Sequence, residues 1–200
     1  MGITNEQFFK RHAAMGRVAL VGGTTAIDKG IRFAQRHLIA EGRHSYWSHV
    51  FVLQGERVDG SQWLLESDID IRLGKMLRVG VQENRIDKYA DEKAYPNVAV
   101  LDFGFSDADA RKLVSAGLDL VSGATRYALG GLVKTYVAIL RQQVGKERKQ
   151  DSTFCSSFVR AVYQHVGIDL AAGVAVRHTA PEHIAQTRIP HERFELIRQK

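Results

Sequence analysis

A single cysteine, Cys155, in a chain of 200 residues excludes an internal disulfide and any zinc site built from several cysteines. The fold must therefore be held together by its own hydrophobic core. With 44% hydrophobic residues, a chain of this length can bury a full core as one globular domain. We expect one domain over residues 1–200, with residues 1–16 as an N-terminal helical extension.

Apolar periodicity alternates along the chain between strand and helix patterns. Strands are predicted at 17–21, 49–54, 62–68, 98–103 and 194–197. Helices are predicted at 5–14, 24–40, 106–123, 132–144 and around Cys155. The helix over 24–40 has an apolar face formed by Ile27, Ile31, Ala34 and Leu38. This order predicts an α+β fold in which an antiparallel sheet packs against helices.

Apolar residues at helical spacing follow Cys155. The residues on this face are Cys155, Val159, Val162 and Val166. Asp151 or Ser152 is a suitable N-cap and Gly167 a suitable end, so Cys155 is expected in the exposed first turn of a helix. Free backbone N–H groups and the positive end of the helix dipole would favour a thiolate there. A buried packing residue is the alternative for a lone cysteine.

The strands at 49–54 and 62–68 flank a short loop and form a predicted β-hairpin. If Gln54 pairs with Ser61 across the loop, His49 falls opposite Glu66, and the two side chains share a face. An imidazole held by a carboxylate is the base half of a nucleophile–base–orienter triad. The alternative is a hydrogen-bonded histidine at a strand start and an exposed acid at a strand end.

Three segments together resemble a known group of enzymes. They are 46–52 (YWSHVFV), 63–67 (WLLES) and 154–159 (FCSSFV). The residues of these segments and their order along the chain are similar to those of proteins with the circularly permuted NlpC-type papain-like fold. This group includes YiiX-like hydrolases and lecithin:retinol acyltransferase-like enzymes. In that group the histidine strand precedes the cysteine helix. The segment 179–185 (TAPEHIA) is similar to a late Thr-Pro-containing segment of the group, with Ala180 inserted.

The resemblance implies Cys155 as the nucleophile, His49 as the general base and later acid, and Glu66 as the orienting residue. The backbone N–H of Cys155 would form part of an oxyanion hole. Four residues are expected to bind substrate, namely Tyr127, Ser156, Trp47 and His44. Core packing is the alternative for Tyr127, and an exposed loop position is the alternative for His44.

Metal and cofactor sites are not expected. His165 lies nearly three turns from Cys155 on the predicted helix, too far to act as its base. The remaining candidates, His178, His183 and His191, do not have a recognised metal-ligand spacing.

The expected function is that of a metal-independent cysteine hydrolase that cleaves an amide through a thioacyl intermediate, with peptidoglycan peptides as the first substrate. The alternatives are an acyltransferase or esterase acting on lipid or N-acyl groups, and a non-catalytic module that binds anionic ligands. The net charge of +6 would favour anionic partners. No aromatic and basic interleaving of the nucleic-acid-binding type occurs, so we expect no specific nucleic-acid partner.

The N-terminal residues lack the apolar stretch of a secretory signal, and no apolar run reaches transmembrane length. We therefore expect synthesis in the cytoplasm without a cleaved signal peptide. A peptidoglycan substrate would then require a signal-independent secretion route, as antibacterial effectors use. An immunity or delivery protein would be a partner in that case.

Overall fold

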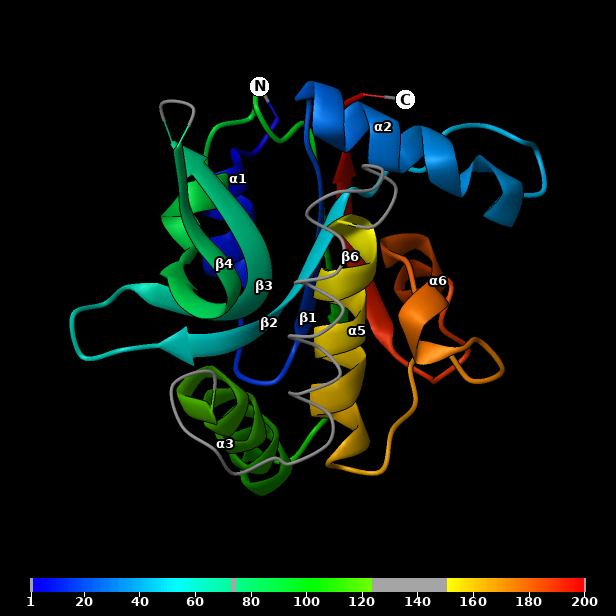
Figure 1. Cartoon of the computed structure of the whole chain (residues 1–200). Helices are drawn as coiled ribbons and strands as arrows, with labels where there is room; N and C mark the ends of the chain where they lie inside the picture. The colour runs from blue at the N-terminus through cyan, green and yellow to red at the C-terminus, as the bar shows by residue number, and fades with distance from the viewer. Residues whose placement is uncertain (1, 73–74, 124–150, 200) are drawn as a thin grey trace.

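The computed structural model describes residues 2–72, 75–123 and 151–199. Its centre is a six-stranded antiparallel sheet with the order β4-β3-β2-β1-β5-β6 (Figure 1). The strands are β1 (Val18–Gly22), β2 (His49–Glu56), β3 (Gln62–Arg72), β4 (Lys75–Arg85), β5 (Asn97–Asp102) and β6 (Glu192–Ile197). All five predicted strands are present, and the predicted α+β class is confirmed.

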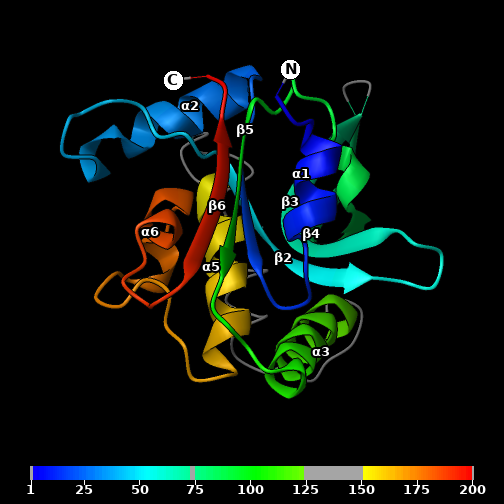
Figure 2. The same ribbon diagram turned by 180° about the vertical axis from the view of Figure 1, so that it is seen from behind.

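Helices cover both faces of this sheet. The α-helices are α1 (Asn5–His12), α2 (Ala26–Ala34), α3 (Asp107–Gly123), α5 (Asp151–Gln164) and α6 (Pro181–Ala185). The short 3-10 helices are η1 (Gln35–Leu38), η2 (Ile86–Tyr89) and η3 (Val176–His178). Helix α5 packs on one face and α1 on the other (Figures 1 and 2). None of the helices described in the structure is both long and apolar enough to cross a membrane.

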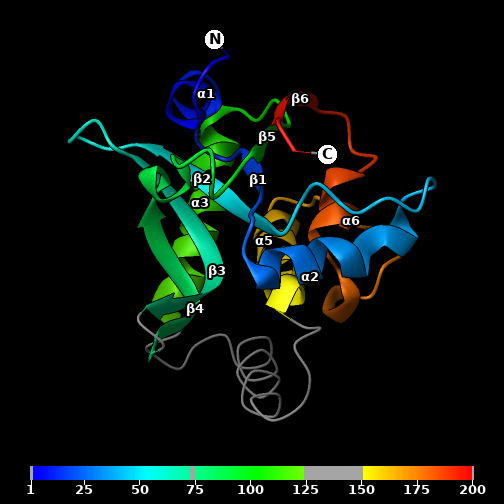
Figure 3. The same cartoon turned by 90° about the horizontal axis from the view of Figure 1, so that it is seen from above.

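Helix α5 lies between the curved β3–β4 ribbon and α6 (Figures 1 and 3). Its inner face carries Cys155, Phe158, Val159 and Val162 into the larger core cluster, which also contains Val50, Val52 and Leu65 of the sheet. The opposite face of the sheet contributes Phe51, Leu53 and Leu64 to a second cluster under α1 and η2. Alternation along β2 and β3 therefore supplies apolar side chains to both faces.

Local capping explains several helix boundaries. Thr4 Oγ1 accepts from the Gln7 backbone N–H at 3.1 Å, while Gln7 Oε1 accepts from the Thr4 backbone N–H at 2.9 Å. Ser106 caps α3, with its Oγ accepting from the Asp109 backbone N–H. After α5, Gly167 adopts a φ of 79°, which suits glycine. These interactions link residues close in sequence, which is why a sequence can reveal them.

The helix predicted over 24–40 differs from the structure. Helix α2 ends at Ala34 and continues as η1, and Ile27 on its predicted apolar face is 48% exposed. Arg32 and Gln35 are buried instead. They donate hydrogen bonds of 2.8 Å to the carbonyl oxygens of Ser45 and Trp47, respectively. The inner side of this helix is polar because it satisfies the backbone of the segment that leads into β2.

The segment between Asp68 and Asn97 contains two elements that the sequence analysis missed. Strand β3 continues to Arg72, and β4 pairs with it from Arg72↔Lys75 to Trp63↔Arg85. Strand β4 then leads directly into η2. This hairpin brings η2 alongside β3 and so places side chains of β4 and η2 beside Glu66.

The predicted register of β2 and β3 was wrong by two residues. Val52 lies opposite Leu65, and this pairing carried along the strands places Asp68, rather than Glu66, opposite His49. Glu66 is two residues from Asp68 and therefore shares its face of the sheet. The prediction that His49 and Glu66 share a face thus survives the change in register.

A β-bulge determines this result. Near the loop Glu56 pairs with Gln62, and the register shifts between Leu53 and Gly55. Without the extra residue, the pairing set at the loop would place His49 and Glu66 on opposite faces, because a one-residue slip inverts every side chain. The bulge is the local irregularity that lets the two side chains meet.

The close packing of β1 against the segment that leads into β2 can be tested by substitution. A Cβ on Gly22 would overlap the carbonyl oxygen of Tyr46, so Gly22→Ala should lower the free energy of unfolding in urea by about 2 kcal/mol. Gly30→Ala is the matched control, because a Cβ there meets nothing within 4 Å and the site is helical. That control should gain up to about 1 kcal/mol. Equal stability of the two variants would contradict the packing described.

Candidate active site

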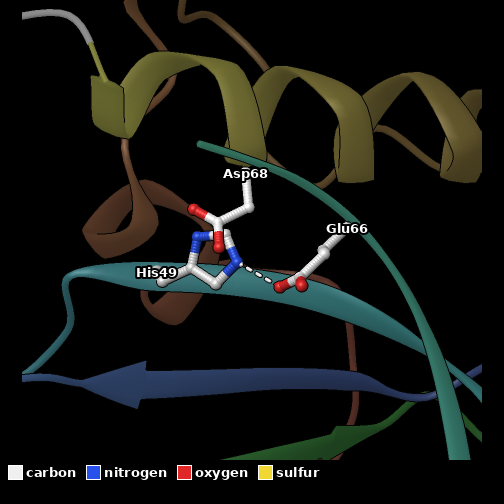
Figure 4. Close-up of side chains that lie close together, drawn as sticks. All are labelled: His49, Glu66 and Asp68. Atoms are coloured by element: carbon white, nitrogen blue, oxygen red, sulfur yellow. Dashed lines mark hydrogen bonds and ion pairs between the residues drawn. The ribbon is translucent and has the colours of Figure 1, made fainter. Parts of the chain in front are cut away.

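His49 and Glu66 are in direct contact. The Nε2–H of His49 donates to Oε2 of Glu66 at 2.8 Å (Figure 4). His49 is the first residue of β2, and Glu66 lies within β3. The Glu66 side chain is fully buried, whereas that of His49 is 14% exposed. The prediction that these two residues are neighbours is confirmed.

Cys155 is the second residue that interacts with His49. It is four residues after Asp151, the first residue of α5 that the structure describes. The sulfur interacts with His49 through both a side-chain hydrogen bond and its charge. Since Nε2 of His49 is occupied by Glu66, Nδ1 is the ring nitrogen left for Cys155. The imidazole therefore connects a thiol to a carboxylate.

The surroundings of His49 favour its charged form. Burial lowers the pKa of His49, but the charge of Cys155 and the hydrogen bond with it raise the pKa. The hydrogen bond to Glu66 and the charge of Asp68 raise it further, and the result lies well above the usual 6.5. An imidazolium is thus stabilised between three groups that can carry negative charge.

The predicted exposure of Cys155 was wrong. Its side chain is 1% exposed and belongs to the core cluster between α5 and the sheet. The physical reason is that α5 packs on the sheet with the face that carries Cys155, Val159 and Val162, so Cys155 is covered together with these residues. The His49 side chain is more exposed than that of Cys155, at 14%.

Glu66 is held by four hydrogen-bond donors. Its Oε1 accepts from Asn84 Nδ2 at 2.5 Å and from Lys88 Nζ at 2.7 Å. Its Oε2 accepts from the Tyr89 hydroxyl at 2.5 Å as well as from His49. Burial raises the pKa of Glu66, but the hydrogen bonds and charges of His49 and Lys88 outweigh it and lower the pKa to about 2. Glu66 is therefore a fixed carboxylate.

Asp68 and Lys88 complete the cluster. Lys88 Nζ lies 2.6 Å from Oδ2 of Asp68 and 2.7 Å from Oε1 of Glu66. Burial lowers the pKa of Lys88, but the two carboxylates raise it to a value above its ordinary one. Figure 4 shows the carboxylates of both Asp68 and Glu66 next to the His49 ring.

Four residues of this cluster, Asp68, Asn84, Lys88 and Tyr89, were missed in the sequence analysis. Asp68 had a usable signal, because it shares a strand face with Glu66. The other three had none, because they lie on β4 and η2, which were not predicted.

Two of the predicted substrate-binding residues are buried. Trp47 is 1% exposed and packs in the larger core cluster, and Ser156 is fully buried with its Oγ 3.9 Å from the Cys155 sulfur. Contact of either residue with substrate stays a prediction. His44 lies in an exposed loop, with its ring edge-on to Phe33 at 5.2 Å between centroids, and its contact with substrate stays a prediction. Tyr127, like the predicted helix over 132–144, lies outside the described residues.

Comparison with known proteins identifies the fold. No protein-family model matches the chain, and no curated protein sequence matches it. A solved structure that does match is the crystal structure of the metalloprotein YiiX from Escherichia coli O157:H7 (DUF1105), with a TM-score of 0.53 and 12% sequence identity. The match covers 94% of this chain and 98% of that chain. The fold is YiiX-like. At this identity the likeness shows the fold alone.

The low pKa of Glu66 predicts a pH dependence of stability. Its ordinary pKa is 4.5 and its folded value is about 2, so the ionised form contributes stability above pH 4.5 that is lost as the pH falls toward 2. Glu66→Gln lacks this titration. The difference in unfolding free energy between the wild type and Glu66→Gln should therefore shrink over this range, by on the order of 3 kcal/mol.

Glu56→Gln, which changes an exposed acid of β2, is the matched control and should follow the wild type. Urea unfolding at several pH values measures all three proteins. Parallel pH profiles for the wild type and Glu66→Gln would contradict the description of Glu66 as a buried, ionised group.

Proposed function

We propose that the chain is a metal-independent cysteine hydrolase of permuted NlpC-type, papain-like architecture. In this proposal Cys155 is the nucleophile, His49 the general base and acid, and Glu66 the residue that orients the imidazole. The observation that carries it is the His49 ring, bonded through Nε2 to Glu66 and interacting with Cys155. The histidine strand precedes the cysteine helix in a YiiX-like fold, which also supports the proposal.

The first half-reaction forms a thioester. The Cys155 sulfur attacks the carbonyl carbon of an amide while the proton of the thiol resides on His49. The resulting oxyanion accepts hydrogen bonds from backbone N–H groups. His49 then gives its Nδ1 proton to the leaving nitrogen, the C–N bond breaks, and an amine departs.

The second half-reaction regenerates the thiol. Neutral His49 takes a proton from water, whose oxygen attacks the thioester carbonyl, and the C–S bond breaks to release a carboxylic acid. Cys155 regains its proton from His49. Glu66 contributes by keeping the ring in one orientation, with Nε2 protonated and Nδ1 directed to the sulfur.

The fixed position of Glu66 suits this role. Donors from β2, β4 and η2 meet at its two oxygens, so the carboxylate cannot rotate without breaking several hydrogen bonds. An orienting group that is already locked in place requires little reorganisation during the reaction.

Peptidoglycan peptides are our first proposed substrate, with delivery as an antibacterial effector. The net charge of +6 supports an anionic polymer as the target. The same thioester could pass its acyl group to an amine or hydroxyl acceptor instead of water, which would make the protein an acyltransferase. A binding module for anionic ligands is the non-catalytic alternative.

Mass spectrometry distinguishes these functions. Purified peptidoglycan fragments and phospholipid vesicles would be incubated with the wild type, Cys155→Ala and His165→Ala. We expect new amine and carboxyl ends in the peptidoglycan fragments, unaffected by EDTA and absent with Cys155→Ala. His165→Ala changes an exposed histidine in the turn directly after α5 and should leave activity unchanged. Glu66→Gln should lower the rate on the order of tenfold to a thousandfold.

Lysophospholipid products dependent on Cys155 would replace the peptidoglycan substrate with a lipid acyl group. Activity that EDTA abolishes, that zinc restores and that survives Cys155→Ala would contradict the thiol mechanism itself.

A further inference from the structure

The residues around His49 include the kinds of side chain that bind metals. Within the part of the chain that the structure describes, ligand-type atoms of His49, Glu66 and Asp68 lie within 4.8 Å of one another. One imidazole and two carboxylates are a common ligand set for a divalent transition metal. The similar structure of YiiX is described as that of a metalloprotein. Whether a metal can bind to these three residues depends on which of their lone pairs are not already used in hydrogen bonds.

Glu66 has little capacity left for a metal. A carboxylate offers about four lone-pair positions. Each oxygen of Glu66 already accepts two hydrogen bonds, from Asn84 and Lys88 on Oε1 and from His49 and Tyr89 on Oε2. The side chain is also fully buried, so water cannot take over any of these donors.

The two ring nitrogens of His49 are likewise already in use. Its Nε2 donates to Glu66, and its other nitrogen is the one left for Cys155. A metal on either nitrogen would replace one of these two contacts. Glu66 and His49 therefore have the ligand types for a metal but lack the vacant positions.

The space between the two carboxylates is filled by a cation that belongs to the chain. The Lys88 ammonium lies 2.7 Å from Oε1 of Glu66 and 2.6 Å from Oδ2 of Asp68. A divalent ion bound to either oxygen would lie next to this fixed positive charge and be repelled by it.

We infer that Lys88 is a built-in cation that occupies the metal position of the His49, Glu66 and Asp68 group and excludes divalent metals from it. It neutralises two adjacent carboxylates that would otherwise repel each other. Lys88 holds this position whatever bond Cys155 cleaves, so metal binding tests it independently of activity.

Removal of the ammonium should open the site. Lys88→Met keeps a side chain of similar length but removes the charge and the donor from both carboxylates. We expect this variant to bind one Co²⁺ or Zn²⁺ at least about tenfold more tightly than the wild type. Co²⁺ absorption and isothermal titration calorimetry measure this binding, with circular dichroism to verify the fold.

Three further variants make the result specific. Lys88→Arg retains a positive charge and should not gain metal affinity. Lys93→Met changes an exposed lysine of the loop after η2 and should behave as the wild type. Adding Asp68→Asn to Lys88→Met should remove most of the gained affinity, because it takes away a ligand.

Metal binding by the wild-type protein is the measurement that can contradict the inference most directly. Tight binding of one Co²⁺ by the wild type, lost in Asp68→Asn, would overturn the inference even if Lys88→Met proved unstable. A folded Lys88→Met variant with no gain in affinity would also overturn it. Unfolding of Lys88→Met that Zn²⁺ reverses would support it, since the metal would then be replacing the missing cation.

Discussion

The buried carboxylate of Glu66 is the interaction on which the rest of the site depends. Placing a charge in a protein interior is costly unless it is paired and fully hydrogen-bonded. Here His49 and Lys88 supply positive charge, and Asn84 and Tyr89 complete the donors. These donors come from β2, β4 and η2, so one side chain of β3 ties three elements together. Loss of this carboxylate would leave the buried donors without an acceptor.

The geometry of this contact depends on backbone features as much as on the side chains. The bulge between Leu53 and Gly55 sets the face on which His49 lies. The strand end at His49 then allows its ring to contact both Glu66 and Cys155. Arg32 and Gln35 fix the segment before β2 through its carbonyl groups. These backbone features precede and follow His49 in the chain and so set where β2 presents the imidazole.

Sequence patterns predicted the parts of the fold that are set locally. The apolar strands and the helix over 106–123 were predicted because the patterns that indicate them extend over only a few neighbouring residues. The face shared by His49 and Glu66 was predicted correctly from an incorrect register, since an error of two residues preserves the face. Strand β4, η2 and the burial of Cys155 depend on contacts between distant segments. Lys88 and Tyr89 were missed for that reason, although both contact Glu66.

The central claim is that one imidazole links the Cys155 sulfur to the Glu66 carboxylate. The most direct test is the pKa of His49, measured by ¹⁵N NMR in the wild type and in Cys155→Ala. Because the charge of Cys155 and its hydrogen bond raise the pKa of His49, removal of the sulfur should lower that pKa clearly. An identical His49 titration in the two proteins would show that the ring and the sulfur do not interact, and would contradict the account.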